Sequence, residues 1–304
     1  TKNPEEKPYF LTNQSAGSFN TFKHSFEAGT GKFLNNLLSV SARYSIINSD
    51  GYIDRAFSKL NSYNINALFE KGNTKLRFLT FGGKEKTYQA WNGIDKATYE
   101  SNPKFNYSGA IYDANWENII GFYDNETDNY RQNHYHLLWE QKLGKIWNLE
   151  TTFHLTHGEG YYENYKQDAK FSKYDLPNIV ENGNTITRTD FIRKKWLDND
   201  FYGVVSNLYG NFENVNLNFG VAANQYFGRH FGNVTGVKFT NIFEHEYYRN
   251  NALKNEVSGF AKAIYKMEKL EFFGDLQLRN IDYKTYILDE NAEEGADLSQ
   301  KWTF

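Results

Sequence analysis

Apolar and polar residues alternate with a period of two over long stretches of this chain. In one such stretch Leu149, Phe153 and Leu155 occupy odd positions, and Glu150 and His154 lie between them. Because successive side chains of a β-strand point to opposite faces, the pattern predicts strands with one apolar and one polar face. Ten runs show this pattern, and we expect strands at residues 17–29, 34–47, 59–70, 74–85, 129–142, 146–158, 200–210, 215–227, 254–266 and 269–283.

The connections between these runs alternate between short and long. Short turns are predicted at residues 30–32, 71–73, 143–145, 210–214 and 266–269. Long polar and aromatic loops are predicted at residues 48–55, 85–128, 158–199 and 228–254. All short turns would then fall at one end of the sheet and all long loops at the other. That asymmetry is typical of an outer-membrane barrel, whereas a soluble sandwich usually mixes its loop lengths.

The expected fold is therefore all-β, an antiparallel up-and-down transmembrane β-barrel with short periplasmic turns and long extracellular loops. The polar face, which carries Arg43, Glu150, Asp275 and Arg279, fits either the wet lumen of a barrel or the solvated outside of a sandwich. The placement of the loops favours the barrel. All four prolines lie outside the predicted strands, as expected for a residue without the N–H that a strand ladder needs.

The composition excludes several classes of protein. The chain has 304 residues and no cysteine, so neither a disulfide nor a cysteine–zinc site is available. A net charge of −3 gives no electrostatic footprint for nucleic acid. Mean hydropathy is −0.74, and no apolar run of about 18 residues exists, which excludes a transmembrane helix but not a barrel strand. The aromatic content of 18% suits membrane interfaces, or alternatively a soluble carbohydrate-binding β-sandwich.

Residues 1–16 are predicted to be a polar lead, and residues 17–304 a partial barrel domain. The chain begins with Thr1, contains one methionine and shows no basic-then-apolar signal segment. We therefore expect a mature protein or an excised piece of one. The final segment, residues 289–304, is predicted to be a loop followed by the start of a strand.

Five sequence segments, taken in order, are more specific than the periodicity. They are SDGYIDRA (49–56), GGKEKTYQAWNG (82–93), YDNETDNYRQNHY (123–135), THGEGYYENYK (156–166) and RKKWLDNDFYG (193–203). Together they resemble the barrel domain of TonB-dependent outer-membrane receptors, in the form found in Bacteroidetes-type bacteria. The resemblance extends from about residue 17 to the end of the chain.

The resemblance implies a barrel of about 22 strands whose lumen holds a plug domain. It also implies a place in the outer membrane of a Gram-negative bacterium, with outer-membrane lipid, the plug domain, TonB and a small-molecule ligand as partners. Siderophore-iron, haem or cobalamin would be the nutrient taken up. This chain has only about ten predicted strands and no recognisable plug, so we expect a fragment of such a receptor that does not transport by itself.

Two groups of residues are candidate metal ligands. His134 and His136 lie on the same face of a predicted strand, as a metal site requires, but two lumen-facing polar side chains would show the same spacing. Asp124, Glu126 and Asp128 resemble the start of a calcium loop, although the glycine and the final glutamate of that motif are missing. We expect no cofactor, with a loop-bound Ca²⁺ as the alternative.

Catalysis is not expected. Carboxylate pairs such as Glu159 with Glu163 are present, but a glycosidase needs two at a set separation across a cleft, so a β-rich glycosidase is only an alternative. The sequence contains no serine elbow, phosphate loop or HExxH motif.

Aromatic residues of the predicted long loops are the candidate ligand contacts, because exposed rings bind planar or sugar-like ligands. They are Tyr88, Trp91, Tyr161, Tyr162 and Tyr165. Packing of the loops against each other, or an aromatic girdle at the membrane interface, would use the same residues.

Overall fold

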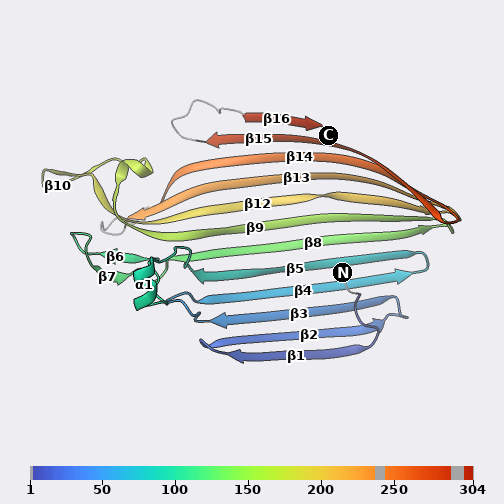
Figure 1. Ribbon diagram of the computed structural model, residues 1–304, viewed down its shortest axis with the longest axis horizontal. Coiled ribbons are helices and arrows are strands. Elements are labelled where there is room, and N and C mark those ends of the chain that lie inside the picture. The colour runs from blue at the N-terminus through green and yellow to red at the C-terminus, as the bar shows by residue number, and fades with distance from the viewer. Residues whose placement is uncertain (1–2, 237–243, 289–297, 304) are drawn as a thin grey trace.

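The computed structural model describes residues 3–236, 244–288 and 298–303. These residues form one large antiparallel sheet of 12 strands, each paired with its neighbour along the chain, with α1, η1 and two small hairpins at one end (Figure 1). The strands of the large sheet are β1 Pro8–Gly17, β2 Thr21–Phe33, β3 Leu38–Ser49, β4 Ser58–Lys71, β5 Thr74–Tyr88, β8 Thr127–Leu143, β9 Trp147–Lys170, β12 Arg188–Asn211, β13 Val215–Gly236, β14 Glu244–Met267, β15 Leu270–Leu288 and β16 Leu298–Thr303.

All ten predicted strands are present, which confirms the all-β, up-and-down architecture. The prediction that residues 1–16 are only a polar lead is wrong for most of that segment, because residues 8–17 form β1 and pair with β2. The strand lacks the period-two pattern, because Tyr9, Phe10 and Leu11 are consecutive and residues 12–15 are all polar. The predicted start of a strand after the last loop is confirmed by β16.

Tight turns join the strands at one end of the sheet, at residues 34–37, 72–73, 144–146, 212–214 and 268–269. The turn predicted at residues 30–32 is wrong. Gly31 instead lies at an irregularity inside β2, and the chain reverses where Leu34, Asn35 and Asn36 adopt positive φ values of 50°, 58° and 64°. Asparagine tolerates this left-handed conformation better than most residues.

The opposite end of the sheet carries the longer connections, at residues 50–57, 89–126 and 171–187. Two predicted loops are much shorter than expected. Residues 158–170 and 188–199 continue β9 and β12, and most of residues 228–254 belongs to β13 and β14, with residues 237–243 outside the described part. One short turn, at residues 18–20, also lies at this end.

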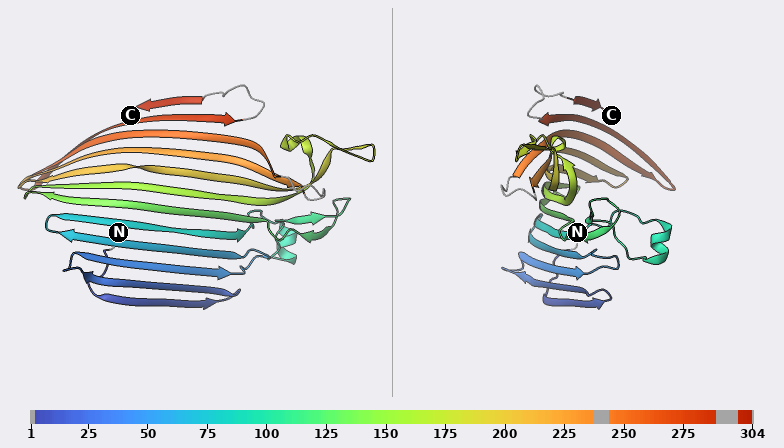
Figure 2. Two further views of the ribbon diagram at one scale, coloured as in Figure 1. Left: turned by 180° about the vertical axis from the view of Figure 1, so that it is seen from behind. Right: turned by 90° about the vertical axis from the view of Figure 1, so that its left-hand side faces the viewer.

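The loops at this end have some structure of their own. Residues 89–126 contain α1 Lys96–Ser101 and a hairpin of β6 Ala110–Tyr112 with β7 Ile119–Phe122. Residues 171–187 contain η1 Phe171–Tyr174 and a hairpin of β10 Ile179–Glu181 with β11 Asn184–Ile186. Both groups project beyond the strand ends in Figures 1 and 2.

A small apolar core packs the loop of residues 171–187 against the sheet. Phe171 and Tyr174 of η1 pack against Phe191 of β12 and Val234 of β13, and all four side chains are at most 1% exposed. Ring centroids lie 5.4 Å apart for Phe171 and Phe191, and 5.0 Å for Tyr174 and Phe191. Within the described residues, the one cluster of fully buried apolar side chains thus lies between η1 and the outer ends of β12 and β13.

The sheet has one apolar and one polar face, as the alternation predicts. Leu137 of β8 lies opposite Phe153 of β9, and both stay open to the surroundings, with 43% and 50% of their surface exposed. On β15, Leu276 is 80% exposed. No element in the described part of the chain covers this apolar face. Among the described residues no helix is long and apolar enough to cross a lipid bilayer.

The segment before β1 lies against the polar face near the tight turns. The backbone N–H of Lys32 donates to the Glu6 carbonyl (2.9 Å), and Lys32 Nζ lies 3.0 Å from the Glu6 carboxylate and 3.8 Å from that of Glu70. Further along, Arg77 donates a hydrogen bond to Asn3. Residues 3–6 therefore cross from the sheet edge towards β5.

Candidate functional site

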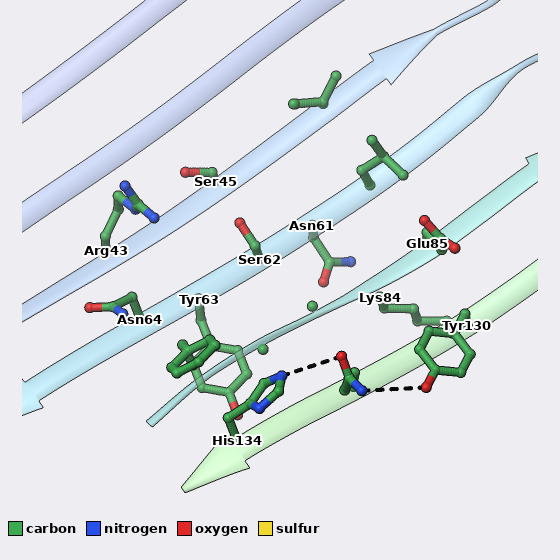
Figure 3. A pocket seen from close by; sticks show the side chains of 16 residues that line it. Arg43, Ser45, Asn61, Ser62, Tyr63, Asn64, Lys84, Glu85, Tyr130 and His134 are labelled. Atoms are coloured by element: carbon green, nitrogen blue, oxygen red, sulfur yellow. Dashed lines mark hydrogen bonds between the residues drawn. The ribbon is translucent and has the colours of Figure 1, made fainter. Parts of the chain in front are cut away.

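The polar face is hollowed near the loop end of the sheet (Figure 3). The hollow has a volume of about 500 Å³ and is lined by β3, β4, β5 and β8. Its side chains include Arg43, Asn64, Glu85, Tyr130 and His134. Since both charge signs and several hydrogen-bonding groups line it, this surface suits a polar solute better than an apolar one.

Hydrogen bonds along β8 connect the side chains of this hollow. Gln132 Nε2 donates to the Tyr130 hydroxyl (3.5 Å), and Gln132 Oε1 lies 3.3 Å from Nε2 of His134. A Cβ on Gly158 of β9 would lie 2.4 Å from the Tyr130 hydroxyl, so glycine at that position makes room for the tyrosine. The wall of the hollow is thus preformed.

The prediction that His134 and His136 share a face is confirmed. Both rings contact Phe81, with ring-centroid distances of 4.4 Å and 5.6 Å, and the two imidazole centroids lie 6.2 Å apart. The Nδ1 atom of His134 lies 2.9 Å from the hydroxyl of Thr156. Neither histidine belongs to a group of three potential metal ligands within the described residues, and both lie on the polar face.

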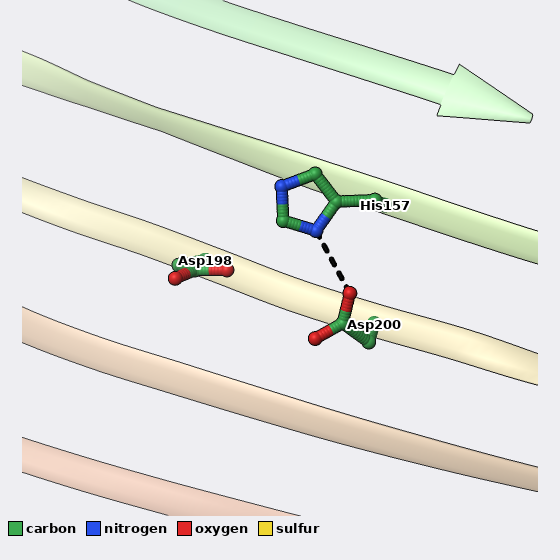
Figure 4. A group of neighbouring side chains, drawn as sticks. All are labelled: His157, Asp198 and Asp200. Atoms are coloured by element: carbon green, nitrogen blue, oxygen red, sulfur yellow. Dashed lines mark hydrogen bonds and ion pairs between the residues drawn. The ribbon is translucent and has the colours of Figure 1, made fainter.

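A different cluster brings three potential metal ligands together (Figure 4). His157 of β9 and Asp198 and Asp200 of β12 hold ligand atoms within 4.8 Å of one another. Arg229 of β13 already bridges the two carboxylates, with Nη2 at 2.8 Å from Asp198 and 2.9 Å from Asp200. A guanidinium thus supplies the positive charge that a metal would bring. Sequence reasoning missed this cluster because only the pairing of His157 with Asp200 across two strands reveals it.

Tyr88, one of the predicted ligand contacts, is buried, with 4% of its surface exposed. Its hydroxyl lies 3.0 Å from the carbonyl oxygen of Ser108 and 2.8 Å from that of Tyr123, and burial raises its pKa. The guanidinium of Arg55 lies 5.7 Å from its ring centroid. Tyr88 therefore fastens the loop of residues 89–126 to the sheet and presents no surface to a ligand in this structure.

Trp91, which is exposed, pairs with the half-buried Tyr162. Trp91 is 60% exposed, and the two rings meet edge to face with their centroids 5.7 Å apart. Because the two residues are remote in sequence, no sequence pattern indicates that they pair. Among the five predicted aromatic residues, Trp91 offers the most accessible ring surface.

Tyr161 belongs to an aromatic row across neighbouring strands. Its ring lies 4.4 Å from that of Trp196, and the Trp196 ring stacks at 5.7 Å on Phe231. Two cations flank the row, Lys194 at 5.0 Å from the Tyr161 centroid and Arg249 at 4.2 Å from the Phe231 centroid. The rings pack across β9, β12 and β13, where these strands extend beyond the apolar belt of the sheet, which Leu137 and Phe153 mark.

The acidic segment around Glu126 is part of a buried polar network. The Glu126 carboxylate accepts hydrogen bonds from the backbone N–H of Tyr165 (2.8 Å) and from the Asn164 amide (2.7 Å). Glu126 is 6% exposed, and burial raises its pKa. The structure does not gather Asp124, Glu126 and Asp128 into a cation-binding group within the described residues.

Tyr165 is held from two sides. Its hydroxyl donates to Asp190 (2.7 Å), and its ring stacks on Tyr123 with the centroids 5.7 Å apart. Burial and the hydrogen bond to Asp190 raise its pKa. Tyr165 therefore has a structural role in this region.

No family model matches this chain, and no curated protein matches it by sequence. Solved structures do share its fold. The ferric-catecholate import receptor Fiu of E. coli K12 is 12% identical with a TM-score of 0.67, and the match covers 100% of this chain and 51% of Fiu. The ferric citrate transporter FecA is 8% identical with a TM-score of 0.69, over 100% of this chain and 42% of FecA. The copper transporter OprC is 11% identical with a TM-score of 0.65, over 99% and 43%.

At these identities the similarity establishes the fold. The sheet has the fold of part of the β-barrels of these proteins, which confirms the fold class expected from the alternation and from the loop asymmetry. The chain spans about half of the length of these proteins or less, with shares between 42% and 51%.

Proposed function

We propose that this chain is part of the barrel wall of an outer-membrane receptor that takes up a scarce small-molecule nutrient with energy supplied through TonB. The observation that carries the proposal is the two-sided sheet. Its uncovered face is apolar, its other face is polar, and its longer loops lie at one end. A barrel in a Gram-negative outer membrane needs lipid against the first face and water against the second.

The dimensions of the strands agree with this assignment. A barrel strand crosses the bilayer with about 9–11 residues, and β9, β12 and β14 each have 24. The excess lies at the loop end, beyond the apolar belt that Leu137 and Phe153 mark. Long strands and loops would then stand outside the cell, and the tight turns would face the periplasm.

Several finer parts of the proposal rest on sequence or on the similar structures alone. The Bacteroidetes-type form rests on the five segments described above. A metal or metal chelate as cargo rests on the similarity to Fiu, FecA and OprC, which import ferric-catecholate, ferric citrate and copper. A plug domain of the parent protein would lie against the polar face, where residues 3–6 already run. A loop-bound Ca²⁺ stays a prediction.

The alternatives lack support in the structure. A soluble β-sandwich needs a second sheet against the apolar face, and the described part of the chain provides none. A glycosidase needs two carboxylates across a cleft, whereas Glu163 is 4% exposed and accepts hydrogen bonds from Tyr123 and Asn125.

Single-tryptophan variants test the membrane assignment. Trp139 lies on the apolar face and Trp91 in the loop region. In liposomes that contain brominated lipid, we expect strong quenching of a protein with Trp139 as its only tryptophan, and little quenching when only Trp91 remains. Equal quenching of both, or a protein that stays folded and monodisperse without lipid or detergent, would contradict the proposal.

A further inference from the structure

A second hollow on the polar face is lined by histidines. Its volume is about 570 Å³, and residues of β8, β9, β12 and β13, four central strands of the sheet, line it. His134 and His136 come from β8, and His154 comes from β9. The other lining residues carry amides, hydroxyls and aromatic rings, and none of them is charged. The three imidazoles therefore share a polar but uncharged surface.

The spacing of the three imidazoles is close to that of rings that share one metal ion. His136 lies directly opposite His154 in the pairing of β8 with β9. The ring centroids lie 6.2 Å apart for His134 and His136, and 6.5 Å apart for His136 and His154. Two imidazoles that bind one ion at about 2 Å each have ring centroids roughly 5–6.5 Å apart. As the rings stand, their nitrogen atoms do not converge within 4.8 Å, so binding would turn the rings and leave the strands in place.

Hydrogen bonds orient two of the rings and set their tautomers. Nε2 of His154 lies 2.8 Å from Oδ1 of Asn224, and Nε2 of His134 lies 3.3 Å from Oε1 of Gln132. Because an amide oxygen only accepts, each Nε2 carries the proton and each Nδ1 has a lone pair. Nδ1 of His134 meets the rotatable hydroxyl of Thr156 at 2.9 Å, and no described residue hydrogen-bonds to Nδ1 of His154. Histidines that bind metals have this arrangement, with the other ring nitrogen held by a polar group.

The donor atoms of the hollow select the class of ion. Imidazole suits Zn²⁺, Ni²⁺ and Cu²⁺, whereas Ca²⁺ and Mg²⁺ take oxygen ligands, chiefly carboxylates. The hollow offers three imidazoles and no carboxylate. The cluster of His157, Asp198 and Asp200 lies on the other face of the sheet, since His157 is in phase with Phe153. Arg229 already lies within 2.9 Å of both of its carboxylates. The histidine hollow is therefore the better place for a transition-metal ion.

We propose that His134, His136 and His154 bind one divalent transition-metal ion on the polar face of the sheet, with water as the remaining ligand. The pairing of β8 with β9 adds His154 to the two histidines that the sequence predicts as candidate ligands. The site goes beyond the proposed function and does not depend on it, because it uses only side chains that this pairing brings together.

Calorimetric titration of the detergent-solubilised full chain with Zn²⁺ at neutral pH tests the proposal. We expect saturable binding, and at least a tenfold loss of affinity in His136→Gln and in His154→Gln, each of which removes one ligand and keeps a polar side chain. The matched control is His157→Gln, which removes a histidine from the other face of β9 and should leave the affinity within twofold. Absence of wild-type binding, or an affinity of either ligand variant within twofold of wild type, would overturn the proposal.

Electron paramagnetic resonance with Cu²⁺ identifies the ligands of the wild-type chain without any substitution. We expect hyperfine splitting from three imidazole nitrogens, and from two in His136→Gln. A spectrum of oxygen ligands with at most one nitrogen would assign the ion to carboxylates and overturn the proposal. Because neither measurement needs a membrane, a negative result here together with quenching of Trp139 by brominated lipid would refute this site and leave the receptor assignment standing.

Discussion

The side-chain amide of Gln167 pairs with the backbone of Tyr112 as a neighbouring strand would. The Tyr112 N–H donates to Oε1 at 2.8 Å, and Nε2 donates to the Tyr112 carbonyl at 2.7 Å. This pairing joins β9 to a hairpin that lies 55 positions away in the sequence. It fixes the position of the hairpin, in which Trp116 stacks on Tyr112.

Replacing Gln167 by leucine should loosen the β6–β7 hairpin without unfolding the sheet. The substitution removes both hydrogen bonds, each worth about 1 kcal/mol. We expect amide hydrogen exchange in residues 110–122 to become at least tenfold faster, while exchange in β8 stays unchanged. Asn184→Ala in the exposed β10–β11 hairpin is the control. Unchanged protection in the Gln167 variant would show that other contacts hold the hairpin.

Glu126 should make the free energy of unfolding depend on pH. Because burial raises its pKa above the ordinary value of 4.5, the folded state keeps this proton at pH values where the unfolded chain has lost it. The folded protein therefore loses stability as the pH rises from about 4.5 through the raised value. The slope is at most about 1.4 kcal/mol per pH unit.

The variant Glu126→Gln lacks the titrating group, so its stability relative to wild type should improve over that pH range. Urea unfolding in detergent micelles at several pH values measures the difference. Glu117→Gln, in the exposed turn of the β6–β7 hairpin, removes the same charge at the surface and serves as the control. A constant difference between wild type and Glu126→Gln across the range would contradict the prediction.

A lysine on the apolar face should be costly only if that face meets lipid. Phe153→Lys places a charge beside Leu137 and should lower the free energy of unfolding in liposomes by about 2–4 kcal/mol, if the site is near the bilayer midplane. Thr152→Lys changes the adjacent residue, which points to the polar face, and should have a much smaller effect. Equal effects at the two positions would argue against a membrane-facing surface.

The strands and their two faces could be predicted from the sequence because alternation is a local property. The outer halves of β9 and β12 could not, since polar and glycine-rich stretches such as residues 158–164 resemble a loop. Their strand structure comes from backbone pairing with each other, for example between Glu163 and Lys194, and single-sequence patterns do not reveal such partners.

The candidate site was predictable only in part, for the same reason. Aromatic loop residues were identified by type, yet burial separates Tyr88 from Trp91, and burial depends on contacts with distant residues such as Ser108 and Tyr123. The cluster of His157, Asp198 and Asp200 was missed because His157 meets Asp200 only when β9 pairs with β12. No spacing in the sequence indicates that meeting.

Two glycines that differ in backbone conformation allow the tight-turn end to be tested. Gly144 has a φ of +75° in the turn between β8 and β9, whereas Gly274 lies in β15, and an added Cβ would meet nothing within 4 Å at either position. Gly144→Ala should therefore cost about 1–2 kcal/mol through backbone strain alone. Gly274→Ala should be neutral or stabilise by roughly 0.5–1 kcal/mol, since alanine loses less conformational entropy than glycine.

Equilibrium unfolding of both variants in the same detergent measures these differences directly. Because neither substitution creates a steric contact, a difference between them isolates the left-handed conformation at Gly144. Asparagine tolerates that conformation, so Gly144→Asn should recover part of the loss. Equal stability of Gly144→Ala and Gly274→Ala would mean that the turn relaxes to another conformation, and that the short connection at residues 144–146 does not depend on glycine.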